Sequence, residues 1–462
     1  MGATRTHKPW HRPLYVAAGC LLGMLLCAPA GVLMGAPAEG HPEEKFRFAP
    51  GFSATQPITL TRTDDGLRFE WPAVAKWDTA LLELHLEGAE QEPYIEISAG
   101  TAHLVQYLDA NATGTRSVNL SGLRGIESGT TVTLYPHALT LTPNATLRWF
   151  DNHLDLRQRL LVIAPHPDDA EIAAFGLYAD RAATIVTITA GNAGDMNYRA
   201  EISDPPEHYR VKGYLRAVDS VTVPWQGGIP PQRTYNLGYF DGRLDAMYDA
   251  PDRVFPEVYG PNEDVAPYRR ANLGSLLPNS SRTNSWRHLV EDLITVLRKA
   301  NPAIIVMPDP RIDTHADHEF AAVAVAQAVE RWQGSARFLL YANHFAKDHY
   351  PYGPAGTVMS LPAAGALMLQ GVYSHPTPSV LQLRKVFALE SMHDLRLSPE
   401  EQSTCGISGV DRRPDYPRQI EVDYLRRAPR DNELFSVFDR EGLRQVIRDF
   451  LPGHNAAPHG SP

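Results

Sequence analysis

Between residues 51 and 150 the apolar residues occur in short runs that alternate with polar residues or are rich in β-branched side chains. Turn signals separate these runs, among them Asp64-Asp65-Gly66 and Ser128-Gly129. Short strands at such spacing, without helical periodicity between them, are typical of antiparallel sheets. The pattern therefore predicts an antiparallel β-sandwich domain over 51–150. Its expected strands cover residues 67–71, 80–86, 94–98, 105–108, 117–120 and 131–135.

Beyond Arg159 the pattern changes to apolar runs that alternate with helical segments. The run at 160–164 is apolar on both faces, as a strand inside a parallel sheet requires. Alternating strands and helices predict a doubly wound, mostly parallel, Rossmann-like α/β sheet over 155–445. Further strands are expected at 184–189, 303–307 and 338–341, with helices at 170–181, 286–299 and 321–332. Long segments rich in Pro, Gly, Asn and Tyr, at 195–235 and 245–285, are interpreted as loops.

The first 38 residues have the features of an export signal. A basic head that ends at Arg12 precedes a mostly apolar run at 14–33, and Ala36-Pro37-Ala38 offers a cleavage site. An uncleaved membrane anchor is the alternative, because the run approaches the ~20 residues that span a bilayer. Either way we expect export to the periplasm or another extracytoplasmic location. Residues 39–50 are interpreted as a linker and 446–462 as a flexible tail.

Composition narrows the classes of partner. The net charge of −10 argues against a nucleic-acid or anionic-membrane surface, so any membrane contact is expected only through the N-terminal segment. Two of the three cysteines, Cys20 and Cys27, lie in that segment, and a cleaved chain would keep only Cys405. This excludes a disulfide framework and a cysteine-based metal site. A metal ion would have to be bound by histidines and carboxylates.

Two clusters of histidine and aspartate follow buried strands of the predicted parallel sheet. Pro165-His166-Pro167-Asp168-Asp169 comes directly after the first strand, and Asp313-Thr314-His315-Ala316-Asp317-His318 comes after the third. The carboxyl ends of such strands are where ligands bind. His166 and Asp169 can reach one ion from a single turn, while Asp168 between them points elsewhere. The second cluster brings two more imidazoles, again three residues apart, to the same edge.

A single His-Pro-Asp sequence would more simply be a turn before a helix, with Asp169 as the N-cap. Two such clusters at one sheet edge favour a metal site instead. They amount to a His/Asp/His triad with a spare carboxylate and a spare imidazole. Catalytic zinc sites have three protein ligands and an open position for water. Zinc lowers the pKa of that water to about 7, and the spare carboxylate can accept its proton.

These segments resemble the PIG-L/LmbE-like deacetylase family. Residues 164–171 are similar to its HPDD signature, and His315-Ala316-Asp317-His318 is similar to its HxDH motif. Residues 189–194 (TAGNAG) and 237–242 (LGYFDG) resemble two further family segments, and 385–393 and 433–435 fit its C-terminal pattern. The resemblance extends from about 160 to 440 and covers nothing between 39 and 150.

The resemblance implies a role for each member of the two clusters. His166, Asp169 and His318 would bind Zn²⁺ or another divalent metal. Asp168 would be the general base, and His315 would stabilise the oxyanion and protonate the departing amine.

The resemblance also implies contacts with the substrate. Arg210 or Arg216, together with Asp241, would touch the sugar. Five other histidines lack such paired spacing and are interpreted as surface or hydrogen-bonded core residues: His208, His344, His349, His375 and His393.

The resulting hypothesis is a zinc-dependent hydrolase that removes the N-acetyl group from a GlcNAc-like unit. Because the chain is expected to be exported, the substrate would be an N-acetylated glycan of an exported polysaccharide or surface glycolipid. One alternative is a metal-dependent hydrolase of another amide or ester. The other is a catalytically inactive glycan-binding protein, although the complete set of histidines and aspartates argues against it.

Overall fold

The computed structural model describes residues 46–277, 280–345, 350–362, 365–395 and 427–454. The export segment, most of the linker, His349, Cys405 and the last eight residues lie outside these ranges, so the expectations about them stay predictions. Across the described ranges, no helix has both the length and the apolar character that a membrane span requires.

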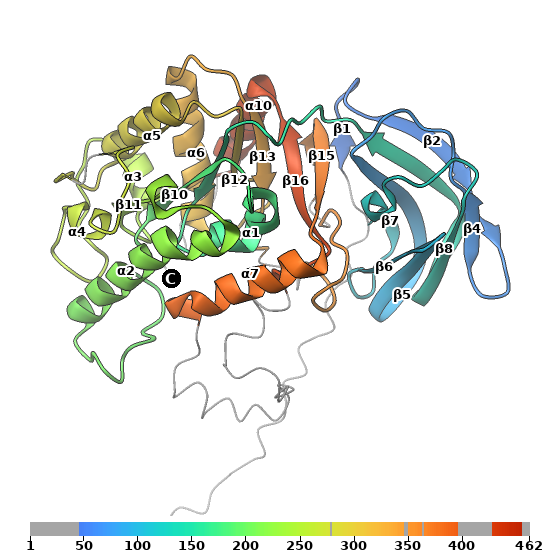
Figure 1. The fold of residues 1–462 in the computed structure, drawn as a ribbon, viewed down its shortest axis with the longest axis horizontal. Coiled ribbons are helices and arrows are strands. Elements are labelled where there is room, and N and C mark those ends of the chain that lie inside the picture. Colours follow the sequence, from blue (N-terminus) through green and yellow to red (C-terminus); the bar gives the residue numbers. More distant parts are fainter. Residues whose placement is uncertain (1–45, 278–279, 346–349, 363–364, 396–426, 455–462) are drawn as a thin grey trace, which may run out of the picture. The chain divides into compact units, whose positions relative to one another are not determined.

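The larger part of the chain is built on a mixed seven-stranded sheet (Figure 1). Its order is β11 (Thr234–Tyr239), β10 (Ala183–Thr189), β9 (Leu160–Ala164), β12 (Ile304–Pro308), β13 (Arg337–Tyr341), β16 (Asn432–Phe438) and β15 (Gly371–Pro376). The first five strands are mutually parallel, and β16 is antiparallel to both of its neighbours. The predicted α/β character is confirmed. The doubly wound, Rossmann-like arrangement in its finer sense stays a prediction.

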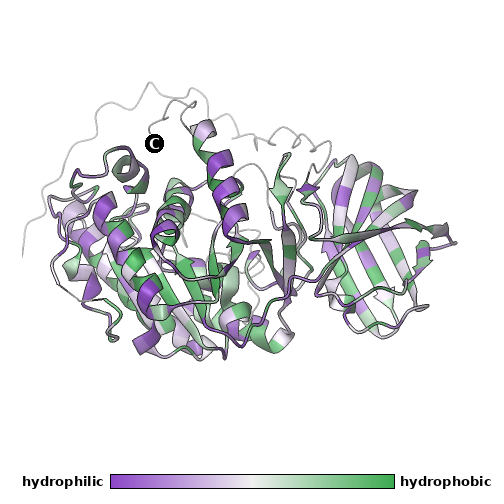
Figure 2. Cartoon of the chain, turned by 90° about the horizontal axis from the view of Figure 1, so that it is seen from above, coloured by the Kyte–Doolittle hydropathy of each residue, from purple (hydrophilic) through white to green (hydrophobic). Residues whose placement is uncertain are grey.

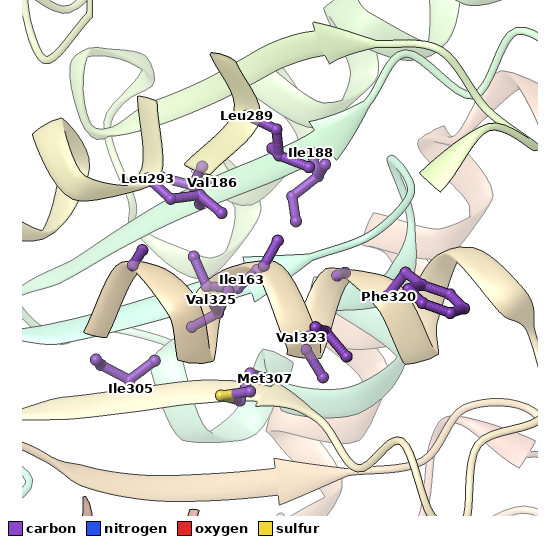
Figure 3. Packing of buried hydrophobic residues seen from close by; sticks show 14 of the residues in the cluster. Ile163, Val186, Ile188, Leu289, Leu293, Ile305, Met307, Phe320, Val323 and Val325 are labelled. Carbon is purple, nitrogen blue, oxygen red and sulfur yellow. The ribbon is translucent and has the colours of Figure 1, made fainter. Parts of the chain in front are cut away.

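Strand β9 shows how the sequence divides the core between the two faces of this sheet. Leu161 and Ile163 join one buried apolar cluster, while Leu160, Val162 and Ala164 join another. Because side chains alternate along a strand, a run that is apolar at every position needs cover on both faces. The helices supply that cover, and Figure 3 shows the first cluster between strands and helices.

The helices of this part match the predicted ones closely in places. The expected helices correspond to α1 (Asp169–Tyr178), α5 (Trp286–Ala300) and α6 (Ala316–Arg331). Short helices occur at α3 (Leu244–Asp249) and α4 (Ala266–Arg269), and 3-10 turns at η2 (Val223–Gly227), η3 (Pro231–Arg233) and η4 (His393–Leu395). The prediction of a loop throughout 195–235 was wrong, because α2 (Pro205–Thr222) lies within it.

The cause of this error lies in the residues that α2 buries. The helix begins with Asp204 as N-cap, which accepts a hydrogen bond from the Glu207 amide, and with proline in its first turn. Its buried face includes the polar residues Lys212, Arg216 and Asp219. A helix with buried charges shows no apolar stripe, so the usual periodic signal is missing.

The C-terminal elements were not predicted as helices or strands. Helix α7 (Ser379–Ser391) follows β15, and α10 (Arg440–His454) follows β16. The assignment of 446–462 to a flexible tail was wrong as far as His454, which ends α10. Strand β1 (Arg47–Phe48) lies inside the predicted linker and pairs with β14 (Met368–Leu369).

The N-terminal region folds as an antiparallel sheet of β2 (Ala54–Thr59), β3 (Thr61–Arg62), β4 (Leu67–Glu70), β5 (Thr79–Ala99), β6 (Ala102–Tyr107), β7 (Gly114–Asn119) and β8 (Thr131–Phe150), with the turn η1 (Ser121–Leu123). Figure 2 shows the alternation of hydrophilic and hydrophobic residues along its strands. The strands expected at 80–86 and 94–98 are one long strand, β5, which pairs with β8 through several register shifts. The antiparallel character is confirmed. The two-layer sandwich and the division into separate domains stay predictions.

Side chains of the antiparallel region hydrogen-bond to strand β15. Thr79 Oγ1 accepts from the Ser374 amide at 3.0 Å, and Asn119 Nδ2 donates to Ser374 Oγ at 3.0 Å. Asn152 Nδ2 donates to the Val372 carbonyl at 2.9 Å. Strand β15 is therefore paired with β16 on one side and contacted by these polar side chains as well.

Candidate metal centre

Three potential ligand atoms converge at the carboxyl ends of β9 and β12. His166 Nδ1 lies 3.1 Å from His318 Nε2 and 3.4 Å from Asp169 Oδ2, and the last two atoms are 3.0 Å apart. Ligands bound tetrahedrally to zinc at their usual distances are separated by about 3.3–3.6 Å. One of the three separations lies in this range, and the other two are shorter by 0.2 and 0.3 Å. The three side chains are buried. The donor set suits a divalent metal ion, and the structure brings together the three residues predicted to bind it.

Each imidazole of this triad has a carboxylate behind it. His318 Nδ1 lies 2.9 Å from Asp313 Oδ2, and His166 Nε2 lies 3.2 Å from Asp241 Oδ1 and 3.3 Å from Asp317 Oδ2. A carboxylate on one ring nitrogen places the proton there and leaves the lone pair of the other nitrogen directed at the triad. Lone pairs and a carboxylate oxygen so close together repel one another unless a cation or protons lie between them.

The pKa values of the two imidazoles reflect this excess of negative charge. Burial lowers the pKa of His318, but Asp169 and Asp313 outweigh burial and raise it to about 10. Burial likewise opposes the charged form of His166, yet Asp241 and Asp169 raise its pKa well above the ordinary value. Both shifts come from the carboxylates around the two rings, and such surroundings favour a positive charge at this position.

Further polar groups, for which the sequence pattern predicts no role, orient the ligands. Asn343 Nδ2 donates to Asp169 Oδ1 at 2.8 Å, which leaves Oδ2 to face the imidazoles. Asp313 Oδ2 also accepts from the Asn343 amide at 2.9 Å. Asp317 accepts from the amides of Gly242 at 2.7 Å and Leu244 at 3.1 Å. Asn343 follows strand β13 at the same sheet edge, which was the available sequence signal.

Asp168, the predicted general base, makes a different contact from Asp169. Its Oδ2 accepts a hydrogen bond from Arg216 Nη2 at 3.0 Å. Burial raises the pKa of Asp168, and the Arg216 guanidinium acts against that shift. The two adjacent aspartates thus diverge, one toward an arginine and the other toward the two imidazoles.

His315 caps helix α6 next to the triad. Its Nδ1 accepts from the Asp317 amide at 3.2 Å, so the proton of the neutral ring lies on Nε2. The ring centroid lies 4.7 Å from that of His166 and 5.1 Å from that of His318. Burial lowers the pKa of His315, and the neighbouring His166 lowers it further. A neutral imidazole with Nε2–H can donate a hydrogen bond.

His344 also belongs to this site, although it was interpreted as a surface or core residue. Its ring centroid lies 4.8 Å from that of His318 and 5.3 Å from that of His315. Its possible ligand atom lies within 4.8 Å of those of Asp169 and His318. Burial, reinforced by His318, lowers its pKa to about 4. The other described histidines hydrogen-bond elsewhere, as expected, with partners Tyr198 for His208, Tyr373 for His375 and Asp219 for His393.

The residues predicted to touch the sugar are placed differently from one another. Arg216 is buried against Asp168, and Asp241 lies behind His166. Arg210 is not brought to the site, because its side chain is 62% exposed and pairs with Glu207 at 3.5 Å. Sugar contacts by Arg216 and Asp241 stay predictions, and the contacts with the catalytic groups were not foreseen.

Comparison with known proteins supports the expected family. Residues 161–329 match the model of the PIG-L family, described as GlcNAc-PI de-N-acetylase, and this confirms the resemblance for that segment. No curated protein matches the chain.

Several solved structures resemble the chain only distantly. The zinc-inhibited form of teicoplanin deacetylase Orf2 has 14% identity and a TM-score of 0.33, over 61% of this chain and 98% of that one. The 4-carboxy-2-hydroxymuconate hydratase GalB of Pseudomonas putida has 11% identity and a TM-score of 0.31, over 66% and 98%. A family two carbohydrate esterase from Cellvibrio japonicus has 13% identity and a TM-score of 0.15, over 60% and 86%. Scores this low carry no functional argument. The family match supports a deacetylase-type hydrolase.

Proposed function

We propose that this protein is a zinc-dependent hydrolase that removes the N-acetyl group from a GlcNAc-like unit of an exported polysaccharide or surface glycolipid. The observation that supports it most is the convergence of His166 Nδ1, Asp169 Oδ2 and His318 Nε2, each imidazole with a carboxylate behind it. The match to a de-N-acetylase family favours an N-acetyl substrate over other amides.

The residues around the triad fit the chemistry of amide hydrolysis. Zinc, when bound, supplies a Lewis acid that polarises the acetamide carbonyl and lowers the pKa of a water molecule. Asp168 accepts a proton from the attacking water through Oδ1, because Oδ2 is bound by Arg216. His315 donates a hydrogen bond from Nε2 to the developing oxyanion. The C–N bond then breaks, the departing amine takes the proton that Asp168 accepted from water, His315 stays neutral, and the products are acetate and a free amino sugar.

The proposed location of the substrate is argued from the N-terminal sequence. An exported enzyme is separated from cytosolic metabolites, so a glycan at the cell surface or in the periplasm is the substrate we propose. N-terminal sequencing of the protein recovered from an extracytoplasmic fraction tests the first half, with a mature chain that begins just after Ala38 expected from cleavage. A chain recovered only from the cytosol would overturn it.

Acetate release distinguishes this function from its rivals. The zinc-loaded protein is incubated with N-acetylglucosamine and with its oligosaccharides, and acetate is measured beside the Asp168→Asn variant as a matched control. We expect release by the wild type alone. Hydrolysis of simple esters or other amides without deacetylation would support a different metal hydrolase. Glycan binding without any turnover, at full metal occupancy, would support an inactive binding protein.

A further inference from the structure

Arg216 lies between two carboxylates. Its Nη2 donates to Asp168 Oδ2 at 3.0 Å, and its Nη1 lies 3.1 Å from Asp394 Oδ2. All three side chains are at most 14% exposed. A guanidinium is a planar fork that binds one carboxylate with both arms wherever geometry permits. Here one arm contacts each carboxylate, and Oδ2 is the Asp168 oxygen that accepts the hydrogen bond from Arg216.

Asp394 is itself held from several directions. It belongs to the 3-10 turn η4, which follows α7. Lys212 Nζ lies 3.3 Å from Asp394 Oδ1, and Asn197 Nδ2 donates to the same oxygen at 3.0 Å. Lys212 is buried and also donates to the Asp195 carbonyl at 2.7 Å. The carboxylate that receives the second arm of Arg216 is therefore fixed in position.

The backbone makes room for this arrangement at Gly191. A Cβ atom there would lie 2.7 Å from Arg216 Cζ and Nε, and the glycine has a φ of +66°. The Gly191 carbonyl is also within 3.4 Å of Arg216 Nη1. The turn after β10 thus forms one wall of the slot in which the guanidinium lies, and only glycine fits there without strain.

We infer that Asp394 is a positioning residue for the base: by binding Nη1 of Arg216, it prevents that guanidinium from closing on both oxygens of Asp168. This rests on the proposed function, in which Asp168 Oδ1 accepts the proton. Without Asp394, both arms of Arg216 turn to Asp168, and the oxygen needed for proton transfer is occupied. Asp394 thereby acts on the reaction from η4, far along the sequence from the two clusters at residues 165–169 and 313–318.

A double-mutant cycle tests whether Asp394 acts through Arg216. The variants are Asp394→Asn, Arg216→Met and the combination, each assayed for kcat and KM on an N-acetylglucosamine oligosaccharide, for zinc content and for thermal unfolding. Carboxylates that orient a catalytic site through one intermediate side chain are worth about 10- to 100-fold. We expect Asp394→Asn to lower kcat by that factor while KM and zinc content hold. In the Arg216→Met background it should change kcat by less than about twofold, the usual limit for independent effects.

Asp219→Asn is the matched control. Asp219 lies on the same helix, α2, and fixes the same turn through the backbone amide and Nδ1 of His393, at 2.8 and 2.7 Å. It is not one of the two carboxylates, Asp168 and Asp394, between which Arg216 lies. We expect it to lower thermal stability and leave kcat within about twofold. Equal loss of kcat in Asp219→Asn, or an Asp394→Asn effect that is the same in both backgrounds, would overturn the inference.

A crystal structure of Asp394→Asn separates this inference from the proposed function. We expect Arg216 to contact both oxygens of Asp168 there. If the wild type releases no acetate from any N-acetylated sugar but Arg216 shifts as described, the proposed function fails and the positioning role of Asp394 stands. If Arg216 keeps its single contact, the inference is wrong whatever the activity.

Discussion

Each of the two sheet regions contains a buried cluster of charged side chains, and the two clusters differ in how their charges are balanced. In the antiparallel region, Arg116 binds Asp109 with two hydrogen bonds of 2.7 Å, and its remaining arm donates to the carbonyls of Thr113 and Thr115. In the other region, His166 and His318 are surrounded by carboxylates with no arginine or lysine among their described hydrogen bonds and ion pairs.

The difference teaches how to distinguish a structural charge from a functional one. A buried charge whose partners all come from the chain needs nothing further. A buried cluster in which negative groups exceed the positive ones, and in which lone pairs converge, is suited to hold a cation or protons from outside. The depth of burial is similar in both regions, so burial alone would not have separated them.

Removing a ligand should have the largest effect. We expect His318→Ala to lose zinc and to lower acetate release by more than the about 10²- to 10⁴-fold that a general base contributes. Zinc content by elemental analysis and turnover are measured on the same sample. Arg116→Met serves as control and should keep its zinc. Full occupancy in His318→Ala would mean that the metal lies elsewhere.

Asp168→Asn should come next in size. The carboxylate contacts Arg216 and not the imidazoles, so zinc content should hold while turnover falls about 10²- to 10⁴-fold. His315→Ala should behave alike, with rate lost and metal kept. An empty site in Asp168→Asn, together with a full one in Asp169→Asn, would exchange the roles of the two aspartates.

The carboxylates behind the imidazoles should matter less than the ligands themselves. Asp313→Asn is expected to weaken zinc binding by about 10- to 100-fold, because the amide no longer fixes the Nδ1 proton of His318 as firmly. Competition with a chelator of known affinity measures this. An unchanged zinc affinity would show that Asp313 serves only to hold the backbone of His315, Asn343 and His344, whose amides donate hydrogen bonds to it.

Zinc affinity should rise with pH. Burial lowers the pKa of His318 in the metal-free site, but Asp169 and Asp313 raise it to about 10, so the ring carries a proton at pH 6–8 and must lose it on binding. Each proton released makes affinity about tenfold stronger per pH unit. Titration calorimetry in buffers of different ionisation enthalpy counts the protons. Affinity independent of pH over this range would contradict the raised pKa.

Breaking the ion pair between Arg116 and Asp109 in the antiparallel region should have the smallest effect on activity. Asp109→Asn leaves Arg116 buried without its counter-charge, which costs about 3–5 kcal/mol of folding free energy. Zinc content and kcat at a temperature below the unfolding transition should be unchanged. Denaturant unfolding gives the stability, and a loss of zinc from this variant would show that the two clusters are coupled.

The sequence was sufficient to predict those structural features that depend on residues close together in the chain. Strand β9 was predicted residue for residue, because an apolar run bounded by a charged segment and by Pro165 has few other interpretations. His166 and Asp169 share one turn, and the parallel strands place His318 at the same edge. The spacing of His166 and Asp169, together with the rule that parallel strands end at the same edge of a sheet, was therefore enough to predict the triad.

What the sequence did not give depends on contacts between distant segments. Helix α2 escaped prediction because several of its buried residues are charged. Lys212 and Arg216 share a partner, Asp394, that lies in η4, in a distant part of the sequence. Asn343 and His344 acquire their roles only because β13 lies beside β12. The pattern of apolar and polar residues does not predict which carboxylate pairs with which arginine.

The hydrogen bonds from Thr79, Asn119 and Asn152 to strand β15 have a consequence for handling the protein. Strand β15 is the last in the order of the mixed sheet, and a bare edge strand is a template for pairing with another molecule. A shortened chain that begins at residue 153 would keep His166, Asp169 and His318, the proposed metal ligands, but expose this edge. Such a chain should self-associate on purification, so preparations of the catalytic part are best begun no later than β2.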